Sequence, residues 1–327
     1  MIGMSVLHDD PREIRRQAVQ SALDARRSPT ERNRLGQFAT PHDLAVEMAR
    51  YVGRLLGPRR GGLRFADPAI GTGSFFSAAL AVFGRARLAS AVGVELDPAF
   101  CEAAHELWSG AGLTVVRGDF TRIVADRDRR SAPNLILANP PYVRHHHLER
   151  VDKQRLQALA QQMAGVQVSG LAGLYVYFVL LATVWMEDGG YAAWLIPSEF
   201  IDVNYGAALR HYLSERVTLF RAHRFNPDDV QFDDALVSSV ILVLRKSPPR
   251  HGHTVEFTFG GTLAAPDAAE SVPLSRLRAA RKWTVYPSHA RNDRRTSADD
   301  DGPTLDDFFS VQRGIATGSN KDRKSVV

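Results

Sequence analysis

Cysteine is almost absent from this chain, since Cys101 is the only one among 327 residues. A single thiol excludes a disulfide framework and any metal site built from several cysteines, so a reducing, cytoplasmic location is expected. The charged residues Asp9, Asp10 and Glu13 leave no apolar core for a signal peptide. One uncharged stretch, 164–186, is interrupted early by polar residues and glycines. Its apolar part is too short for a bilayer and predicts a helix buried against a sheet.

The overall composition is that of an ordinary globular protein, with 44% hydrophobic and 24% charged residues. A chain of 327 residues is long enough for one large α/β domain and part of a second. The 41 basic residues outnumber the 36 acidic ones, giving a net charge of +5. This mild excess is compatible with a polyanionic partner without requiring one.

Apolar runs alternate with helical patterns from residue 63 onwards, which predicts a parallel sheet covered by helices on both faces. In such sheets a ligand is expected at the edge where the strands end. The expected strands are 63–66, 89–95, 113–116, 134–138, 191–196, 217–222 and 236–244, the last paired with 217–222 or with 255–259.

The most informative stretch is 135–142, where an apolar strand runs directly into Asn139-Pro140-Pro141-Tyr142. This sequence suits methyl transfer to a planar amino group, which is a poor nucleophile because its lone pair is delocalised. The Asn139 side-chain carbonyl and the Pro140 backbone carbonyl would accept its N–H groups and concentrate electron density on the nitrogen. Pro141 stiffens the turn, and Tyr142 offers a flat face to a base. The alternative is a proline-rich turn with an ordinary surface tyrosine.

Three other strand ends carry residues that suit an adenosine-bearing ligand. A glycine turn at 67–73 lets the backbone approach a ligand, and it lacks the third glycine of a dinucleotide fingerprint. Glu95 can accept both ribose hydroxyls, whereas Asp97 is expected to cap the next helix. Asp119 and Phe120 suit hydrogen bonding and stacking with adenine, although Asp119 alone would read as a loop acid without a ligand.

Together, these loops resemble the class I S-adenosylmethionine-dependent methyltransferases. They are most similar to the adenine-N6 DNA methyltransferases of restriction–modification systems with the gamma motif order. In that group a Gly-Gln-Phe-x-Thr-Pro motif precedes the glycine turn, as Gly36–Pro41 does here, and the resemblance runs from Arg34 to Lys246. It implies a doubly wound, mostly parallel seven-stranded sheet of the Rossmann-like methyltransferase fold, followed by the start of a second domain.

The resemblance also implies the site residues. Asn139, Pro140, Pro141 and Tyr142 would be catalytic, and Tyr142 and Phe232 would hold the flipped target base. Thr40 is also expected to cap the following helix, with Pro41 in its first turn and Asp43 completing a capping box. The S-adenosylmethionine pocket would be lined by Phe38, Thr40, Asp67, Ala69, Gly71, Gly73, Glu95, Asp119, Phe120 and Asn139.

The implied function is methylation of adenine N6 in flipped-out, double-stranded DNA, in a restriction–modification or phage-defence system with a cognate endonuclease as a candidate partner. The alternative is methylation of a protein glutamine or of a ribosomal-RNA guanine, because those enzymes also use Asn-Pro-Pro-Tyr. Gly36–Pro41 and Phe232 favour DNA. A catalytically idle binding module is a third alternative, which the intact set of loops disfavours.

No metal and no membrane partner are expected. Methyl transfer from a sulfonium needs no metal ion. His145, His146 and His147 follow the catalytic loop, but three adjacent loop residues cannot all reach one ion without strain, and no acidic or cysteine pattern completes a site. They are interpreted as lying near the DNA backbone or as simply exposed.

Three regions are expected: an N-terminal helical arm at 1–33, a methyltransferase catalytic domain at 34–247, and at 248–327 a linker with the beginning of a truncated target-recognition domain. Residues 322–327 match the translation of a sequencing-library adapter, so the natural sequence is expected to diverge near Lys321 and to continue. A genuine basic tail is the alternative. Without its recognition half, such a fragment should bind DNA weakly and with little sequence preference.

Overall fold

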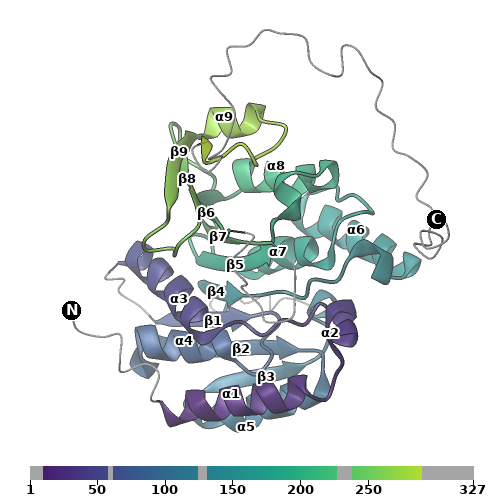
Figure 1. Ribbon diagram of the computed structural model, residues 1–327, viewed down its shortest axis with the longest axis vertical. Coiled ribbons are helices and arrows are strands. Elements are labelled where there is room, and N and C mark those ends of the chain that lie inside the picture. The colour runs from purple at the N-terminus through teal and green to yellow at the C-terminus, as the bar shows by residue number, and fades with distance from the viewer. Residues whose placement is uncertain (1–9, 58–61, 124–130, 227–237, 289–327) are drawn as a thin grey trace, which may run out of the picture. The chain divides into compact units, whose positions relative to one another are not determined.

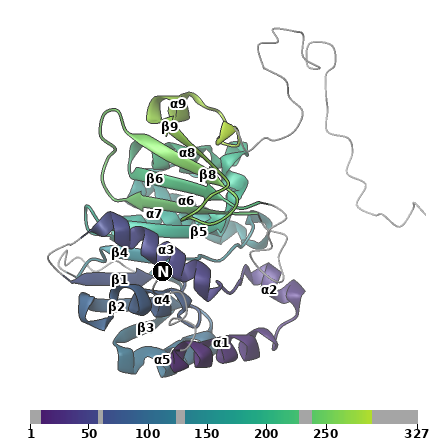
Figure 2. The same ribbon diagram turned by 60° about the vertical axis from the view of Figure 1, so that its left-hand side comes forward.

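The computed structural model describes residues 10–57, 62–123, 131–226 and 238–288 (Figures 1 and 2). The helices are α1 (Pro11–Asp24), α2 (Pro29–Leu35), α3 (His42–Leu56), α4 (Ser74–Phe83), α5 (Pro98–Trp108), α6 (Arg150–Ala164), α7 (Leu174–Trp185), α8 (Ala207–Glu215) and α9 (Leu274–Ala279). The strands are β1 (Leu63–Asp67), β2 (Leu88–Glu95), β3 (Leu113–Arg117), β4 (Leu135–Ala138), β5 (Tyr191–Pro197), β6 (Thr218–Arg224), β7 (Ser239–Arg245), β8 (Thr254–Phe259) and β9 (Ala268–Pro273).

All of these strands form one sheet in the order β3-β2-β1-β4-β5-β7-β6-β8-β9. Strands β1 to β5 run parallel to one another. Strand β7 runs antiparallel to both β5 and β6. The expected doubly wound, mostly parallel sheet is therefore confirmed, and β7 pairs with β6, the first of the two partners considered. The strand order reverses between β1 and β4, and such a reversal opens a crevice for ligands at the carboxyl ends of the strands.

The expected number of seven strands is wrong, because β8 and β9 add two more to the same sheet. Strand β8 pairs in parallel with β6, and β9 pairs antiparallel with β8. Val255 and Phe257 of β8 and Val272 of β9 are buried, so both strands contribute to the core. Residues 254–273 lie in the region 248–327, which was expected to hold a linker and the start of a recognition domain, and they extend the sheet. The start of a recognition domain stays a prediction.

The sheet separates two hydrophobic clusters. On one face lie α3, α4 and α5, and on the other lie α6, α7, α8 and α9 (Figure 1). Strand β5 shows the division, because Ala192, Trp194 and Ile196 point into one cluster and Ala193 and Leu195 into the other. Side chains alternate along a strand, so a strand covered on both faces must be apolar throughout.

The apolar stretch 164–186 contributes helix α7, which has 12 residues. Nine of these residues are buried, which confirms the expected helix packed against the sheet. Across the described ranges, no helix combines the length and apolar character that crossing a bilayer requires.

A buried histidine in β6 makes stability depend on pH. His223 is fully buried, its Nδ1 lies 2.9 Å from Thr258 Oγ1, and its Nε2 has no hydrogen-bond partner among the described residues. Burial, with a smaller contribution from the nearby Arg221 charge, lowers the pKa of His223 to about 4. The folded protein therefore holds the neutral imidazole at a pH where an unfolded histidine is already protonated.

We expect the free energy of unfolding to fall as the pH drops from about 6.5 to 4, by up to roughly 1.4 kcal/mol per pH unit, because the unfolded chain binds the extra proton. Urea denaturation across this range measures the slope. The variant His223→Gln should show a shallower slope, and equal slopes in the two proteins would contradict this assignment.

Candidate active site

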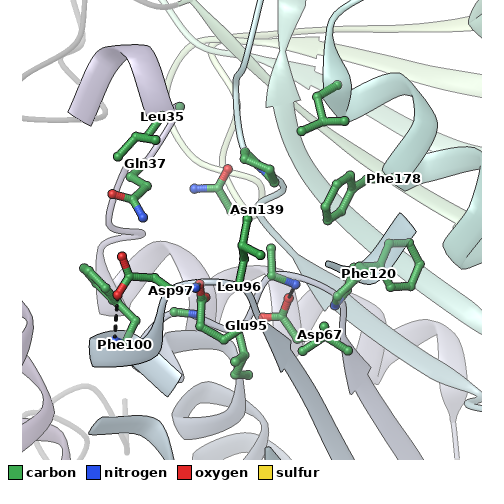
Figure 3. A pocket seen from close by; sticks show the side chains of 18 of the residues that line it. Leu35, Gln37, Asp67, Glu95, Leu96, Asp97, Phe100, Phe120, Asn139 and Phe178 are labelled. Atoms are coloured by element: carbon green, nitrogen blue, oxygen red, sulfur yellow. Dashed lines mark hydrogen bonds between the residues drawn. The ribbon is translucent and has the colours of Figure 1, made fainter. Parts of the chain in front are cut away.

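The loops at the carboxyl edge of the sheet surround a cavity of about 470 Å³. In Figure 3, Gln37, Asp97 and Phe100 lie on one side of this cavity, Phe120 and Phe178 lie on the other, and Asn139 lies between them. We call it the donor cavity. Nine of the ten residues expected in the S-adenosylmethionine pocket line it: Phe38, Thr40, Asp67, Ala69, Gly71, Glu95, Asp119, Phe120 and Asn139.

The tenth residue, Gly73, lies outside the lining and serves the turn. Its φ is +92°, and a Cβ atom at this position would lie 2.4 Å from Trp108 Nε1. The Trp108 indole donates to the Thr72 carbonyl at 2.8 Å, so the turn is held directly against α5. Only glycine fits this close approach with a positive φ.

Two carboxylates at the base of the cavity are fixed by backbone donors. Glu95 accepts hydrogen bonds from the Gly71 N–H at 2.9 Å and from the Asp97 N–H at 2.8 Å. Asp67 accepts the Ala69 N–H at 2.9 Å. Burial raises the pKa of Glu95, and burial together with the Glu95 charge raises that of Asp67 to about 8. A cation bound in the cavity would favour the ionised form of both groups.

The orientation of the Asn139 side-chain amide follows from its hydrogen-bond partners. Its Nδ2 donates to the Phe38 carbonyl and to Thr40 Oγ1, both at 3.1 Å. The Phe38 carbonyl can only accept, so the amide nitrogen must face it and the amide oxygen must face the opposite way. That oxygen, Oδ1, is buried and has no hydrogen-bond partner among the described residues. A buried acceptor without a donor is costly, and it marks a place for a donor from a ligand.

The expected helix cap at Thr40 is wrong. Helix α3 begins one residue later than expected, at His42, and Pro41 occupies the capping position without a side-chain hydrogen bond. Instead, the Thr40 hydroxyl lies at Asn139 Nδ2, and its carbonyl accepts from the Ser74 hydroxyl at 3.0 Å. Thr40 therefore joins the 36–41 loop to the glycine turn and to the catalytic loop. By contrast, the expected cap at Asp97 is confirmed, since its carboxylate accepts from Ala99 N and Phe100 N.

The segment from Asn139 to Tyr142 is also held by Gly36, which ends α2 in the left-handed region with φ +64°. The Gly36 carbonyl accepts the Tyr142 N–H at 3.0 Å, and a Cβ at this glycine would lie 2.3 Å from that same nitrogen. The Tyr142 ring is buried against Phe38, with ring centroids 5.3 Å apart. Glycine thus allows the 36–41 loop to lie directly on the Asn-Pro-Pro-Tyr segment.

Tyr142 faces a second cavity rather than the first. This cavity has a volume of about 360 Å³, and its aromatic lining is Phe38, Tyr142 and Tyr175. We call it the base cavity. Phe38 lines both cavities and so separates them. Glu199, Arg34, Arg144 and His147 are among its polar lining residues.

The remaining expected site residues fall in different places. Pro141 lines the donor cavity, whereas Pro140 is buried and lines neither cavity. Phe232 lies outside the described residues. His145, His146 and His147 form a single 3-10 turn, and the described part of the chain holds no cluster of metal-ligating side chains.

One wall of the donor cavity was not predicted from the sequence. Gln20, Asp24 and Arg27, at the end of α1 and just after it, line the cavity together with Leu96 and Arg155. No periodicity or motif connects residues 20–27 with strand ends that lie far away in the sequence. Leu96 could have been predicted to line the cavity, because it directly follows Glu95, the residue expected to bind the ribose.

Comparison with known proteins shows which family this chain resembles. Residues 131–231, which include the Asn-Pro-Pro-Tyr segment, match the family model of the Eco57I restriction-modification methylases. The chain is 29% identical over 293 residues to the type II methyltransferase M.XamI of Xanthomonas campestris pv. amaranthicola, an alignment that covers 88% of this chain and 53% of the relative. It is 24% identical over 308 residues to M.AccI of Acinetobacter calcoaceticus, covering 89% and 53%.

The chain is therefore similar to the methyltransferases of restriction–modification systems. It spans about half the length of these curated relatives. Solved structures agree on the fold. A Listeria monocytogenes protein described as a class I S-adenosylmethionine-dependent methyltransferase superposes with a TM-score of 0.61 at 16% identity, covering 80% of this chain and 76% of that one. The type IIG restriction endonuclease BpuSI gives 0.62 at 14% identity, covering 82% and 34%.

The contact of Gly36 with the catalytic loop generates a prediction. Gly36→Ala should lower the free energy of unfolding by about 1–3 kcal/mol and displace Tyr142, because the added methyl group overlaps the backbone of the catalytic loop. Gly165→Ala is the matched control, since Gly165 also ends a helix in the left-handed region, with φ +67°, but has no atom within 4 Å of an added Cβ. Thermal and urea denaturation measure both variants, and equal losses would refute a specific role for the contact.

Proposed function

We propose that this chain is the catalytic part of a site-specific DNA methyltransferase, which transfers a methyl group from S-adenosylmethionine to the N6 amino group of adenine. The observation that carries the proposal is the buried, unpaired Oδ1 of Asn139 at the boundary of the donor cavity. An amino group presented there satisfies this oxygen and is polarised by it. The family of the relatives and the flanking loops point in the same direction.

The donor cavity fits the proposed cofactor in charge and in chemistry. Its lining residues include six carboxylates, Asp24, Asp67, Glu95, Asp97, Asp119 and Asp152, but only two guanidinium groups, those of Arg27 and Arg155. S-adenosylmethionine, when bound, supplies an electrophilic methyl group on a cationic sulfonium, and it carries an ammonium group as well. An excess of carboxylates favours such a ligand over a pyrophosphate.

Individual residues then take roles that follow from their positions. Glu95 has both oxygens held by backbone N–H groups, and the remaining lone pairs can accept from a ribose diol. The Phe120 ring packs against Phe178 at 5.1 Å and offers its cavity side to an adenine ring. The Asp119 carboxylate accepts from the Thr121 N–H and hydroxyl, and it keeps acceptor capacity for the adenine amino group.

The base cavity would receive the flipped adenine. Phe38, Tyr142 and Tyr175 provide aromatic surface for stacking, and stacking offsets the few kcal/mol that removing a base from the duplex costs. Arg144 and Arg34 are exposed at this cavity and suit contact with backbone phosphates. The expected contact of Phe232 with the flipped base stays a proposal, because this residue lies outside the described ranges.

Asn139 lines the donor cavity, and its amide is hydrogen-bonded to Phe38, which lines both cavities. Its Oδ1 and the Pro140 carbonyl would accept from the adenine amino group, which draws the lone pair of that nitrogen out of conjugation and towards the methyl group. The hydrogen bonds of Nδ2 to the 36–41 loop keep the amide from turning over. The rate then depends on preorganised acceptors and on positioning.

We further propose that the complete protein carries a target-recognition region beyond residue 288 and acts beside a cognate endonuclease. The curated relatives are about twice as long as the aligned part. Sequence recognition needs base contacts in the DNA grooves, and the cavities described above provide none for flanking bases.

Substitution of Asn139 tests the proposed chemistry. Asn139→Ala should reduce methyl transfer at least roughly a hundredfold, because it removes a preorganised acceptor, and should leave donor binding nearly unchanged. Thr40→Val keeps the amide and removes one of its two orienting partners, so it should cause a smaller loss. Tritium transfer from labelled donor measures activity, and calorimetry measures binding. Wild-type-like transfer by Asn139→Ala would sink the assignment.

The substrate class is tested with the same label. Tritiated donor offered in parallel to DNA, RNA and protein should label DNA. Labelling of RNA or of a protein glutamine instead would move the function to the alternative class, and no labelling of any substrate despite donor binding would favour a binding module.

A further inference from the structure

The end of α1 closes one side of the donor cavity. Gln20, Asp24 and Arg27 line it, whereas most of the other lining residues come from the strand ends, from the 36–41 loop, from the first turns of α4 and α5, and from α6 and α7. Helix α1 lies beside α5 in both views (Figures 1 and 2). A polar helix therefore lies at the edge of the donor cavity, and its position there suggests a function of its own.

The first half of α1 is fastened by a buried ionic cluster. Arg16 and Glu13 are 3% and 2% exposed, and the Arg16 Nε donates to Glu13 at 2.9 Å. Arg16 also donates to Thr72 Oγ1 at 3.0 Å, and the Thr72 hydroxyl donates to Gln20 at 2.7 Å. Since Thr72 lies between the two glycines of the glycine turn, α1 is tied directly to the floor of the cavity. Breaking a buried ion pair of this kind is strongly unfavourable, so this half is fixed.

The second half ends in a much weaker connection. Arg27 donates one hydrogen bond to Gln37 and another to Asp97, and both partners line the donor cavity. Gln37 belongs to the 36–41 loop and Asp97 begins α5, so a single guanidinium joins two walls of the cavity. Its side chain is 27% exposed to solvent. Ion pairs in partial contact with water contribute little and can open and close.

We propose that residues 24–27 belong to the methyl-donor site as a lid, and that Arg27 is a positioning residue whose bridge between Gln37 and Asp97 latches this lid and sets the rate of donor exchange. The proposal rests on the proposed function, because it takes S-adenosylmethionine as the ligand of the cavity. The buried Glu13–Arg16 cluster acts as the fixed end. Opening at Arg27 exposes the side of the cavity formed by Gln37, Asp97 and Phe100 (Figure 3).

Stopped-flow measurement of S-adenosylmethionine association and dissociation tests the lid. Arg27→Ala should raise both rate constants by roughly three- to tenfold, with a smaller change in Kd, because a latch slows passage in both directions. Asp97→Asn should have a similar effect, since asparagine can still cap α5 while the charge is lost. Arg26→Ala is the matched control, because Arg26 is the exposed neighbour outside the cavity lining.

The outcomes separate the alternatives. Unchanged rates in Arg27→Ala, or equal changes in Arg26→Ala, would overturn the latch. Faster dissociation with unchanged association would mean that Arg27 contacts the donor directly, which also overturns the lid. Combining Asp97→Asn with Arg27→Ala should add nothing to Arg27→Ala alone, because that variant already lacks the contact with Asp97.

A measurement made without S-adenosylmethionine tests the lid separately from the proposed function. Hydrogen exchange on the donor-free chain should show faster exchange at residues 24–27 in Arg27→Ala, with unchanged protection at 13–20. A wild-type chain that binds no S-adenosylmethionine would refute the proposed function, whereas uniform exchange along α1 in both proteins would refute the latch alone.

Discussion

The hydrogen bonds of the Asn139 amide to the 36–41 loop are the constraint on which the site depends. Because Nδ2 is held by the Phe38 carbonyl and the Thr40 hydroxyl, the opposite oxygen is fixed in place and left without a partner. Gly36 makes this arrangement possible, since only a glycine there lets the loop lie on Tyr142. A free, rigid acceptor next to a methyl donor is what activation of a conjugated amine requires.

The sheet supplies the rest of the site by placing successive strand ends along one edge. The glycine turn, Glu95, Asp119 and Asn139 follow β1, β2, β3 and β4, which are adjacent in the parallel sheet. Strand order therefore converts four separate short motifs into one cavity. Phe38 divides this cavity from the aromatic base cavity, so that a donor and a base would approach Asn139 from different sides.

Much of this was predictable from the sequence, because strands buried on both faces give apolar runs and parallel strands end at one edge. Nine of the ten expected pocket residues line the donor cavity, and seven of them lie at strand ends for that reason, whereas Phe38 and Thr40 lie in the 36–41 loop and were expected from the family resemblance alone. The errors have physical causes. Thr40 was read as a helix cap because threonine before proline has that signature, yet the hydroxyl is used by Asn139 instead. Strand β8 was expected only as a possible partner at 255–259, and β9 was not expected because one buried residue among its six gives a weak pattern. The α1 wall depends on a buried ion pair and on side-chain contacts between residues that are distant in the sequence, which no periodicity encodes.

The most direct test of the central claim is identification of the methylated atom. DNA incubated with the chain and labelled S-adenosylmethionine would be digested to nucleosides and separated by chromatography with mass spectrometry. The acceptor geometry at Asn139 and the aromatic base cavity predict that the label appears in N6-methyldeoxyadenosine. Label in a methylated cytosine, or in no nucleoside although the donor binds, would contradict the account.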